Sequence, residues 1–390
     1  MTCICLFFHL KIRMKFRLNN EIIMTNKPKI AVIGLKGLPA FGGAAAVGEN
    51  ILEQLKDKYD FTVYSISSHT HLRSGTYNNI CYQKVLKSLP FKKLNSIFYY
   101  IRAALSVFFG NYDLVHLHHR DASFIIPLLR LKYPVILTTH GMVLTDKWKR
   151  FKKLFNLQDR LFMGSASVIT TVSLKDYEIV SKLLKKKNQQ FVYIPNGVSL
   201  TNNSFEKKNT IVFSAGRIIP NKGVHILLEA LSQIKIDEKI QIIGDLEQMQ
   251  EYGDKIREMA SKNRNVELVG LIKDKDKLFN ILGSAKCFVY PSMIESMSMM
   301  MLEVASLGTP IICSRIRENE DVFNDEEVLY FEVGNSIDLA EKLKWAIDNP
   351  SKMLLLAENA KKKLIKNHLW ENIAEKYSQV YDSVLTDKTS

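Results

Sequence analysis

The sequence predicts an α/β protein built from two doubly wound parallel-sheet domains that face each other across a cleft. The chain has 390 residues, which corresponds to about two to three domains at roughly 100–200 residues each. Short β-branched runs alternate with helical stretches, a pattern typical of parallel strands covered by helices on both faces. The alternation breaks at Ile-Pro-Asn-Gly-Val, residues 194–198, and restarts after a polar stretch. We therefore expect two domains, at 24–197 and 198–369.

Each predicted domain repeats the strand–helix alternation. In the first, we expect strands at 29–34, 60–65, 114–117, 135–138 and 167–171, and helices at 44–56, 95–109 and 174–186. In the second, we expect strands at 210–215, 239–243, 265–269, 286–290 and 310–313, helices at 224–232, 250–261, 275–282 and 299–307, and three terminal helices at 336–348, 351–366 and 370–385. Ligands of such sheets bind at the carboxyl ends of the strands, so loops after strands are the candidate site.

The first 23 residues differ from the rest of the chain. Their apolar run is followed, not preceded, by positive charges, which is the reverse of a signal peptide. Met24 opens a segment that reads as a natural start before the first strand. We expect residues 1–23 to be a doubtful or disordered extension, with a weak membrane anchor as the alternative.

Composition narrows the class of protein. No run of about 18 uncharged apolar residues exists, which excludes a protein of several membrane spans. The five cysteines are irregularly spaced and include no C-x-x-C pair. We therefore expect no disulfide framework and a protein of the reducing cytoplasm.

The net charge of +14 is concentrated in one part of the first domain. Residues 84–160 hold 14 Lys and Arg against four acids, which gives 14 − 4 = +10 of the total. Within this region, residues 147–155 mix five cations with Trp and Phe, a composition typical of a helix lying on an anionic membrane surface. An ordinary packed helix with solvated lysines is the alternative. Lysines far outnumber arginines, so we expect no nucleic-acid partner.

Two loops of the first domain could approach a ligand. Gly42 and Gly43 stand between a strand and a helix, where bare backbone and free N–H groups can meet an anion; a simple tight turn is the alternative. His140 directly follows a strand and precedes Gly141. Two further histidines, His116 and His118, share a strand face, but no carboxylate or cysteine completes a metal ligand set.

The second domain has charged residues in or near the loops that follow its predicted strands. Arg217 and Lys222 stand between a strand and a helix, where two cations can hold a diphosphate with charge-assisted bonds. Glu295 follows a strand, and Glu303 lies about 12 Å further along the next helix. That spacing suits contacts with two parts of one extended ligand. Asp274-Lys275-Asp276 spells a metal-binding D-x-D, but we expect it to cap a helix.

In this order, these motifs resemble the family 4 glycosyltransferases, which have the GT-B fold. The resemblance spans about residues 28–386 and rests on the loop ending Gly42-Gly43, on IPNGV at 194–198, on AGRIIPNKG at 215–223, and on Glu295-x7-Glu303 before Leu-Gly-Thr-Pro. It implies two Rossmann-like domains, with a last helix at 370–386 that crosses back to complete the first.

The resemblance also implies roles for individual residues. Arg217 and Lys222 would bind the pyrophosphate of the donor, Glu295 the hydroxyls of the transferred sugar, and Glu303 the ribose. His140 would lie near the C6 hydroxyl of the transferred sugar.

Backbone groups complete the expected donor site. Gly42 and Gly43 would let the first loop approach donor or acceptor, and the N–H groups of Met297, Ser298 and Met299 would touch the distal phosphate. Two departures matter: Ser-Met-Ser replaces the family's Gly-Phe-Gly after the first Glu, and a Gly-Gly pair is missing at residues 314–318.

The implied function is retaining, metal-independent transfer of a sugar from a nucleotide-diphosphate sugar. The expected acceptor is a glycan or lipid-linked glycan in bacterial surface polysaccharide, lipopolysaccharide or capsule, assembly. We expect a cytoplasmic enzyme, peripheral on the cytoplasmic face of the membrane. The alternatives are a GT-B sugar-nucleotide epimerase and a non-catalytic module that binds membrane or nucleic acid.

Overall fold

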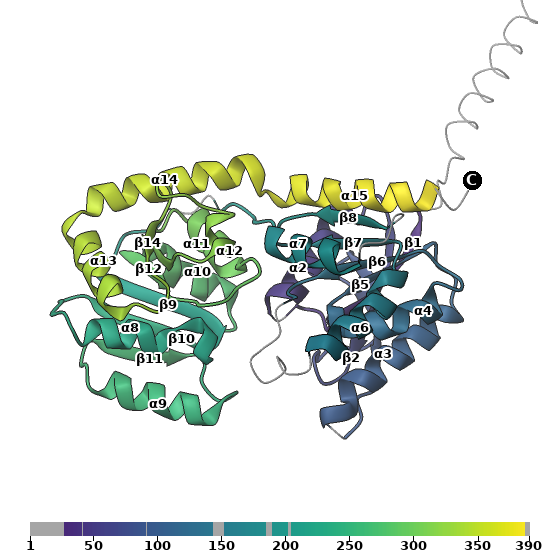
Figure 1. The fold of residues 1–390 in the computed structure, drawn as a ribbon, viewed down its shortest axis with the longest axis horizontal. Coiled ribbons are helices and arrows are strands. Elements are labelled where there is room, and N and C mark those ends of the chain that lie inside the picture. Colours follow the sequence, from purple (N-terminus) through teal and green to yellow (C-terminus); the bar gives the residue numbers. More distant parts are fainter. Residues whose placement is uncertain are drawn as a thin grey trace, which may run out of the picture.

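The computed structural model describes residues 27–40, 42–90, 92–142, 152–184, 189–201 and 204–386. The chain forms two α/β domains side by side, each with a parallel sheet between helices, as predicted (Figure 1). The extension 1–23 lies outside the described residues. So do residues 147–151 of the basic segment, and for the remainder of that segment only the helical backbone is described.

The first domain is built on an eight-stranded sheet of order β3-β4-β2-β1-β5-β6-β7-β8, parallel except for β3. Its strands are β1 (Lys29–Lys36), β2 (Asp60–Ile66), β3 (Gly75–Tyr77), β4 (Cys81–Leu86), β5 (Leu114–His118), β6 (Val135–Thr139), β7 (Val168–Thr171) and β8 (Gln190–Tyr193). Its helices are α2 (Gly43–Leu55), α3 (Lys92–Phe108), α4 (Ile126–Leu129), α6 (Lys152–Phe162) and α7 (Leu174–Leu184), with 3-10 turns η1 (Arg120–Ile125) and η2 (Met163–Ser165).

The second domain has a six-stranded parallel sheet of order β11-β10-β9-β12-β13-β14. Its strands are β9 (Thr210–Arg217), β10 (Lys239–Asp245), β11 (Val266–Gly270), β12 (Cys287–Tyr290), β13 (Ile311–Ser314) and β14 (Leu329–Phe331). Its helices are α8 (Val224–Leu231), α9 (Gln250–Ser261), α10 (Lys275–Ser284), α11 (Met299–Ser306), α12 (Arg317–Glu320), α13 (Ser336–Asp348) and α14 (Pro350–Asn367), with the 3-10 turn η3 (Pro220–Lys222).

The last helix, α15 (Trp370–Thr386), lies along the first domain (Figure 1). Trp370, Tyr377 and Tyr381 are buried in the same core as α2 and β1. A second core on the opposite face of that sheet holds side chains of α3, α4 and α7. The first sheet is therefore covered on both faces, as its near-continuous apolar strands require.

The chain passes between the domains at two adjoining places. Val198 donates its backbone N–H to His368 O at 2.7 Å, and a Cβ on Gly197 would stand 2.5 Å from the ring of Trp370. The glycine of the IPNGV motif thus makes room for the tryptophan that opens α15.

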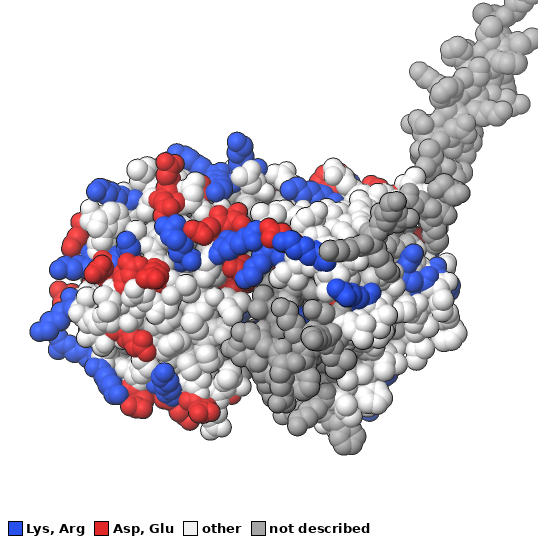
Figure 2. Space-filling view, in the orientation of Figure 1, with Lys and Arg blue, Asp and Glu red and all other residues white. Residues whose placement is uncertain are grey.

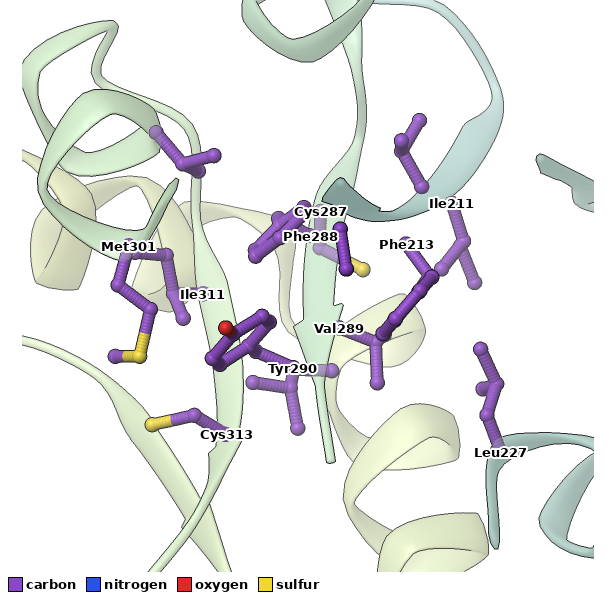
Figure 3. Packing of buried hydrophobic residues seen from close by; sticks show 14 of the residues in the cluster. Ile211, Phe213, Leu227, Cys287, Phe288, Val289, Tyr290, Met301, Ile311 and Cys313 are labelled. Carbon is purple, nitrogen blue, oxygen red and sulfur yellow. The ribbon is translucent and has the colours of Figure 1, made fainter. Parts of the chain in front are cut away.

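The core of the second domain is centred on β12, one of the two central strands of its sheet. Figure 3 shows Phe288 and Tyr290 of β12 beside Phe213 of β9 and Ile311 of β13. The methionines of α11 also pack here: Met301 is buried, and Met299 and Met300 lie against the cluster. The methionine run at the start of α11 therefore fills space in the core.

Among the described residues, no helix is both long and apolar enough to traverse a bilayer.

Candidate active site

A compact polar cluster lies at the carboxyl end of β12. Lys222 Nζ lies 2.5 Å from Glu295 Oε1 and 3.0 Å from the hydroxyl of Tyr290. Tyr290 donates to the same carboxylate oxygen at 2.8 Å, and Ser292 donates to it at 2.5 Å. Tyr290 ends β12, so its hydroxyl is delivered to the sheet edge where a ligand of this fold class binds.

The backbone before α8 brings Lys222 to this cluster. Lys222 ends η3, and Gly223 follows with φ +70. A Cβ on Gly223 would stand 1.9 Å from Pro291 O, so only glycine allows this close contact between the two loops.

The environment fixes the charge of Lys222. Burial alone would lower the pKa of its ammonium, but Tyr290 and Glu295 outweigh that effect and raise the pKa above its ordinary value. Burial raises the pKa of Tyr290 to about 12, with Glu295 acting in the same direction. At neutral pH the cluster therefore carries a protonated lysine and a neutral tyrosine.

Arg217 is the last residue of β9 and not a loop residue, which corrects the sequence prediction. Its side chain is exposed, and within the described ranges no carboxylate forms an ion pair with it. An unpaired guanidinium at the carboxyl edge of a parallel sheet is available to an anion.

Glu303 lies on α11, largely buried, and Lys275 Nζ is 3.4 Å from its Oε1. Burial raises the pKa of Glu303, while Lys275 opposes the shift. The neighbouring Asp274 accepts from the backbone N–H of Lys277 and caps α10, as predicted for the D-x-D spelling.

The loop between Glu295 and α11 gives a role to Ser298, one of the two serines that replace the family's glycines. Ser298 is the N-cap of α11 and accepts from the N–H of Met301 at 3.3 Å. Met297 is buried, and its carbonyl accepts from Asn196 Nδ2 at 3.1 Å. The first turn of α11, which includes Met299, leaves backbone N–H groups without intrahelical acceptors.

Two loops of the first domain meet this loop of the second. A Cβ on Gly43 would lie 3.6 Å from Met299 Cγ. Gly141 has φ +148, and a Cβ there would lie 3.0 Å from Ser296 Oγ. The glycine loop, with Gly42 and Gly43 exposed, and the His140–Gly141 turn therefore both face the segment that follows Glu295.

His140 is partly buried beside other histidines. Its Nε2 lies 3.2 Å from Nδ1 of His118, and the two rings are stacked at 5.5 Å between centroids. Burial, with smaller contributions from His119 and His116, holds the pKa of His140 well below its ordinary value. His140 is therefore neutral at physiological pH.

His116 is used inside the fold. One ring nitrogen lies 2.7 Å from the hydroxyl of Tyr381 on α15, and the other lies 2.7 Å from that of Thr138. Within the described residues, no group of three or more His, Cys, Asp or Glu is placed to hold a metal. The absence of a metal requirement remains a prediction.

The loop after β13, where the family often has Gly-Gly, ties the two domains together. Arg317 forms an ion pair with Glu178 of α7, its Nη1 at 3.1 Å. Glu318, on the same short helix, pairs with Lys175. Arg315 is held by Asp325 and Glu320.

The structure brings Lys222 and Glu295 into direct contact and places Arg217 and Glu303 on elements flanking them. Sequence reasoning missed Tyr290, Ser292 and Asn196 as partners of this region. The position of Tyr290 as the last strand residue before a predicted site loop was an available signal.

Comparison with known proteins supports the same assignment. Residues 41–202 match the model described as "Glycosyltransferase Family 4", and residues 200–363 match that described as "Glycosyl transferases group 1".

Three curated relatives match over most of their lengths. An uncharacterised glycosyltransferase of Methanocaldococcus jannaschii is 27% identical over 89% of this chain and 96% of its own. The capsular polysaccharide biosynthesis glycosyltransferase CapM of Staphylococcus aureus is 26% identical over 65% and 71%. An Escherichia coli UDP-Gal:α-D-GlcNAc-diphosphoundecaprenol α-1,3-galactosyltransferase is 24% identical over 71% and 77%.

Solved structures share the fold. Sucrose-phosphate synthase from Thermosynechococcus elongatus has a TM-score of 0.77 at 20% identity and covers 93% of this chain and 100% of its own. Anabaena HepE, in complex with UDP-glucose, has a TM-score of 0.73 at 16% identity and covers 91% and 100%. The two family models match adjoining halves of the chain, one after the other. The chain therefore belongs to the family 4-type glycosyltransferases and is an enzyme with the GT-B fold.

Proposed function

We propose that this enzyme is a retaining glycosyltransferase that moves a sugar from a nucleotide-diphosphate sugar to a glycan or lipid-linked glycan acceptor in bacterial surface polysaccharide assembly, including capsule or lipopolysaccharide. The observation that carries the proposal is the Lys222–Glu295 cluster at the end of β12, with Arg217, which has no ion-pair partner among the described residues, at the end of the neighbouring strand β9. The HepE complex with UDP-glucose and the galactosyltransferase named for a UDP-Gal donor support the donor class.

The donor's phosphates would lie between two cations and one helix end. Arg217 and Lys222 bind the pyrophosphate, and the N–H groups of Met297, Ser298 and Met299 at the start of α11 bind the distal phosphate. Fixed positive charge of this kind stabilises a diphosphate leaving group as charge develops on it.

The acids and the histidine would hold the sugars at either end. Glu295 accepts hydroxyls of the transferred sugar, and Glu303 accepts those of the ribose. Neutral His140 lies on the opposite side, near the C6 hydroxyl, where the open backbone of Gly42 and Gly43 also leaves room for the donor or the acceptor.

The reaction breaks the bond between the anomeric carbon and the phosphate oxygen and forms a bond to an acceptor hydroxyl on the same face. The departing diphosphate takes the proton of that hydroxyl. The residues of the site supply charge stabilisation and positioning, and the proposed step requires no resident metal. A close pair of carboxylates of the kind that works as nucleophile and acid is not part of this proposal.

The acceptor side of the proposal is a lipid-linked glycan at the cytoplasmic face of a membrane. CapM and the galactosyltransferase, whose name specifies a diphosphoundecaprenol acceptor, support it. Residues 147–155 remain a candidate membrane-binding segment on composition alone.

The test begins with a thermal-shift panel of nucleoside diphosphates and their sugars, since a ligand that binds only the folded state raises the melting temperature. The donor identified there is then incubated with candidate lipid-linked acceptors, and the anomeric configuration of the product is read by NMR. A product of the same configuration as the donor supports the proposal. Inversion refutes the retaining assignment. Release of an epimerised sugar nucleotide without acceptor would favour the epimerase alternative, and salt-dependent nucleic-acid binding without turnover would favour the binding module.

A further inference from the structure

Helix α3 is apolar on two opposite faces. One face, formed by Tyr99, Tyr100, Ala103, Ala104 and Val107, is buried in the core of the first domain. The other face carries large apolar side chains that remain exposed. They are Leu94 (48% exposed), Ile97 (47%), Phe98 (42%), Ile101 (40%), Leu105 (44%) and, just past the helix end, Phe109 (82%).

These six residues form one continuous stripe, here called the α3 stripe. At about 100° per residue they cover an arc of roughly 120°, centred opposite the buried face. An apolar face of a helix is normally covered by protein or lipid, and a helix with two such faces normally has both covered. The exposed apolar arc of α3 is therefore a candidate surface for contact with another molecule or a bilayer.

Cations border the α3 stripe and are held there by contacts. Lys84 Nζ donates to Ser106 Oγ at 2.8 Å, and Arg102 donates to the carbonyl of Lys87 at 2.8 Å. At the far end, Lys132 Nζ donates to the carbonyls of Phe108 and Gly110 at 3.1 and 2.8 Å.

Acidic residues are absent from this part of the sequence. Between Asp60 and Asp113 the chain contains no Asp or Glu. Figure 2 shows acidic and basic side chains intermingled over the second domain, whereas the surface at the lower right, where Figure 1 places α3, is mainly uncharged. The α3 stripe itself is thus uncharged, and the bordering Lys84, Arg102 and Lys132 supply positive charge that no acid between residues 60 and 113 offsets.

The stripe begins at the carboxyl edge of the first sheet, the edge whose loops face the segment after Glu295. Helix α3 follows the carboxyl end of β4, and Gly34, near the carboxyl end of β1, donates its N–H to the hydroxyl of Tyr99 at 3.1 Å. A surface on which α3 lies would therefore run up to the side of the first domain where the proposed acceptor binds, a placement that rests on the proposed function.

We propose that the α3 stripe docks on an anionic lipid bilayer, with the apolar side chains in the interface and the bordering cations at the head groups. A second copy of the chain is the poorer occupant, because a two-fold pairing of stripes would bring like-charged borders together. A bilayer with anionic lipids satisfies both the apolar arc and the positive border. This surface is separate from residues 147–155, and the docking does not depend on the roles proposed for the catalytic residues.

The test is sedimentation of the full chain with vesicles of phosphatidylcholine, with and without phosphatidylglycerol, at low and high salt. The variant Ile97→Ser/Phe109→Ser should lose vesicle binding by at least about tenfold. The variant Lys84→Gln/Arg102→Gln should lose the preference for anionic vesicles and its salt dependence. Leu354→Ser/Leu355→Ser removes two side chains of α14 that are 49% and 58% exposed and serves as the matched control, with unchanged binding.

Thermal melting of each variant establishes that it is folded. Because no donor or acceptor is present, a negative result leaves the proposed glycosyl transfer untouched. The proposal is overturned if the Ile97/Phe109 variant binds like the wild type, or if Lys149→Gln/Arg150→Gln abolishes binding instead. A vesicle-free wild-type dimer, seen by analytical ultracentrifugation and broken by the stripe variant, would likewise overturn it.

Discussion

The contact between Lys222 and Glu295 gives the sharpest test of the site. We consider the variants Lys222→Met and Glu295→Gln, and the double variant that carries both. Lys222→Met keeps most of the aliphatic stem but removes the ammonium, which leaves the Glu295 carboxylate with only the hydroxyls of Tyr290 and Ser292.

The expected loss of stability follows from burial. The two side chains are 20% and 10% exposed. Breaking a buried pair costs about 3–5 kcal/mol, and partial solvent contact places this one near 3 kcal/mol. In a domain of this size that corresponds to about 6–12 °C in melting temperature. In the double variant no charge is left uncompensated, so it should be more stable than Lys222→Met, with a coupling energy of about 1–3 kcal/mol.

Activity should respond differently from stability. Lys222→Met removes a cation from the leaving diphosphate and should reduce kcat/KM by about 100- to 1,000-fold. The double variant should stay equally inactive although its stability returns. Melting curves and initial rates of donor consumption on all four proteins provide the measurement. A coupling energy below about 0.5 kcal/mol would show that the two side chains do not form a stabilising pair, and a Lys222→Met enzyme with wild-type turnover would show that the ammonium is not needed for the reaction.

Three further predictions concern other residues. Gly223→Ala, which forces a Cβ to 1.9 Å from Pro291 O at φ +70, should lower the melting temperature and donor affinity, whereas Gly216→Ala, with open space around it, should change neither; melting and titration with donor decide this. Burial lowers the pKa of His116 to about 3, so below about pH 6.5 the unfolded chain binds a proton that the folded chain does not. The free energy of unfolding therefore falls as the pH drops through that value, by about 1.4 kcal/mol from this group at pH 5.5. Urea unfolding of the wild type and His116→Gln measures the difference, and an equal acid sensitivity of the two proteins would contradict the prediction. Because the pKa of Glu303 is raised, donor affinity should weaken as pH falls toward 5 in the wild type but not in Glu303→Gln, as calorimetry can establish.

Local sequence signals predicted most of the second domain. Its strands and helices alternate with clear apolar runs and capping residues, and helix α9 begins and ends at the predicted residues. Arg217, Lys222 and Glu295 could be singled out as candidates because they lie at or soon after the carboxyl ends of predicted strands, and Glu303 because of its spacing from Glu295 in a motif that resembles the family's.

Elements with weak or mixed patterns were missed. The β3–β4 hairpin at the sheet edge has a strand of only three residues, and its loop at residues 78–80, although Asn78 and Asn79 have positive φ, lacks the Asn-Gly or Asp-Gly pair that marks a hairpin most clearly. Strand β8 has no fully buried residue, and β14 has three residues, too few for a period.

Contacts between the domains could not be predicted from local pattern at all. Three such contacts join residues more than a hundred positions apart. They are the close approach of Gly141 to Ser296, the hydrogen bond from Asn196 to Met297, and the ion pair of Arg317 with Glu178. Such contacts depend on how two finished domains sit against each other, which neither period nor spacing encodes.

Arg217 and Lys222 are proposed to bind the paired phosphates of a nucleotide. Calorimetric titration of the wild type and Arg217→Ala with UDP and GDP, and with the matching monophosphates, measures this binding. We expect one diphosphate to bind the wild type at least about tenfold more tightly than its monophosphate, since a charge-assisted bond contributes about 1.5–3 kcal/mol, and we expect Arg217→Ala to lose that preference. Equal affinity for mono- and diphosphate in the wild type, or a preference that survives in Arg217→Ala, would show that these two residues do not bind the diphosphate.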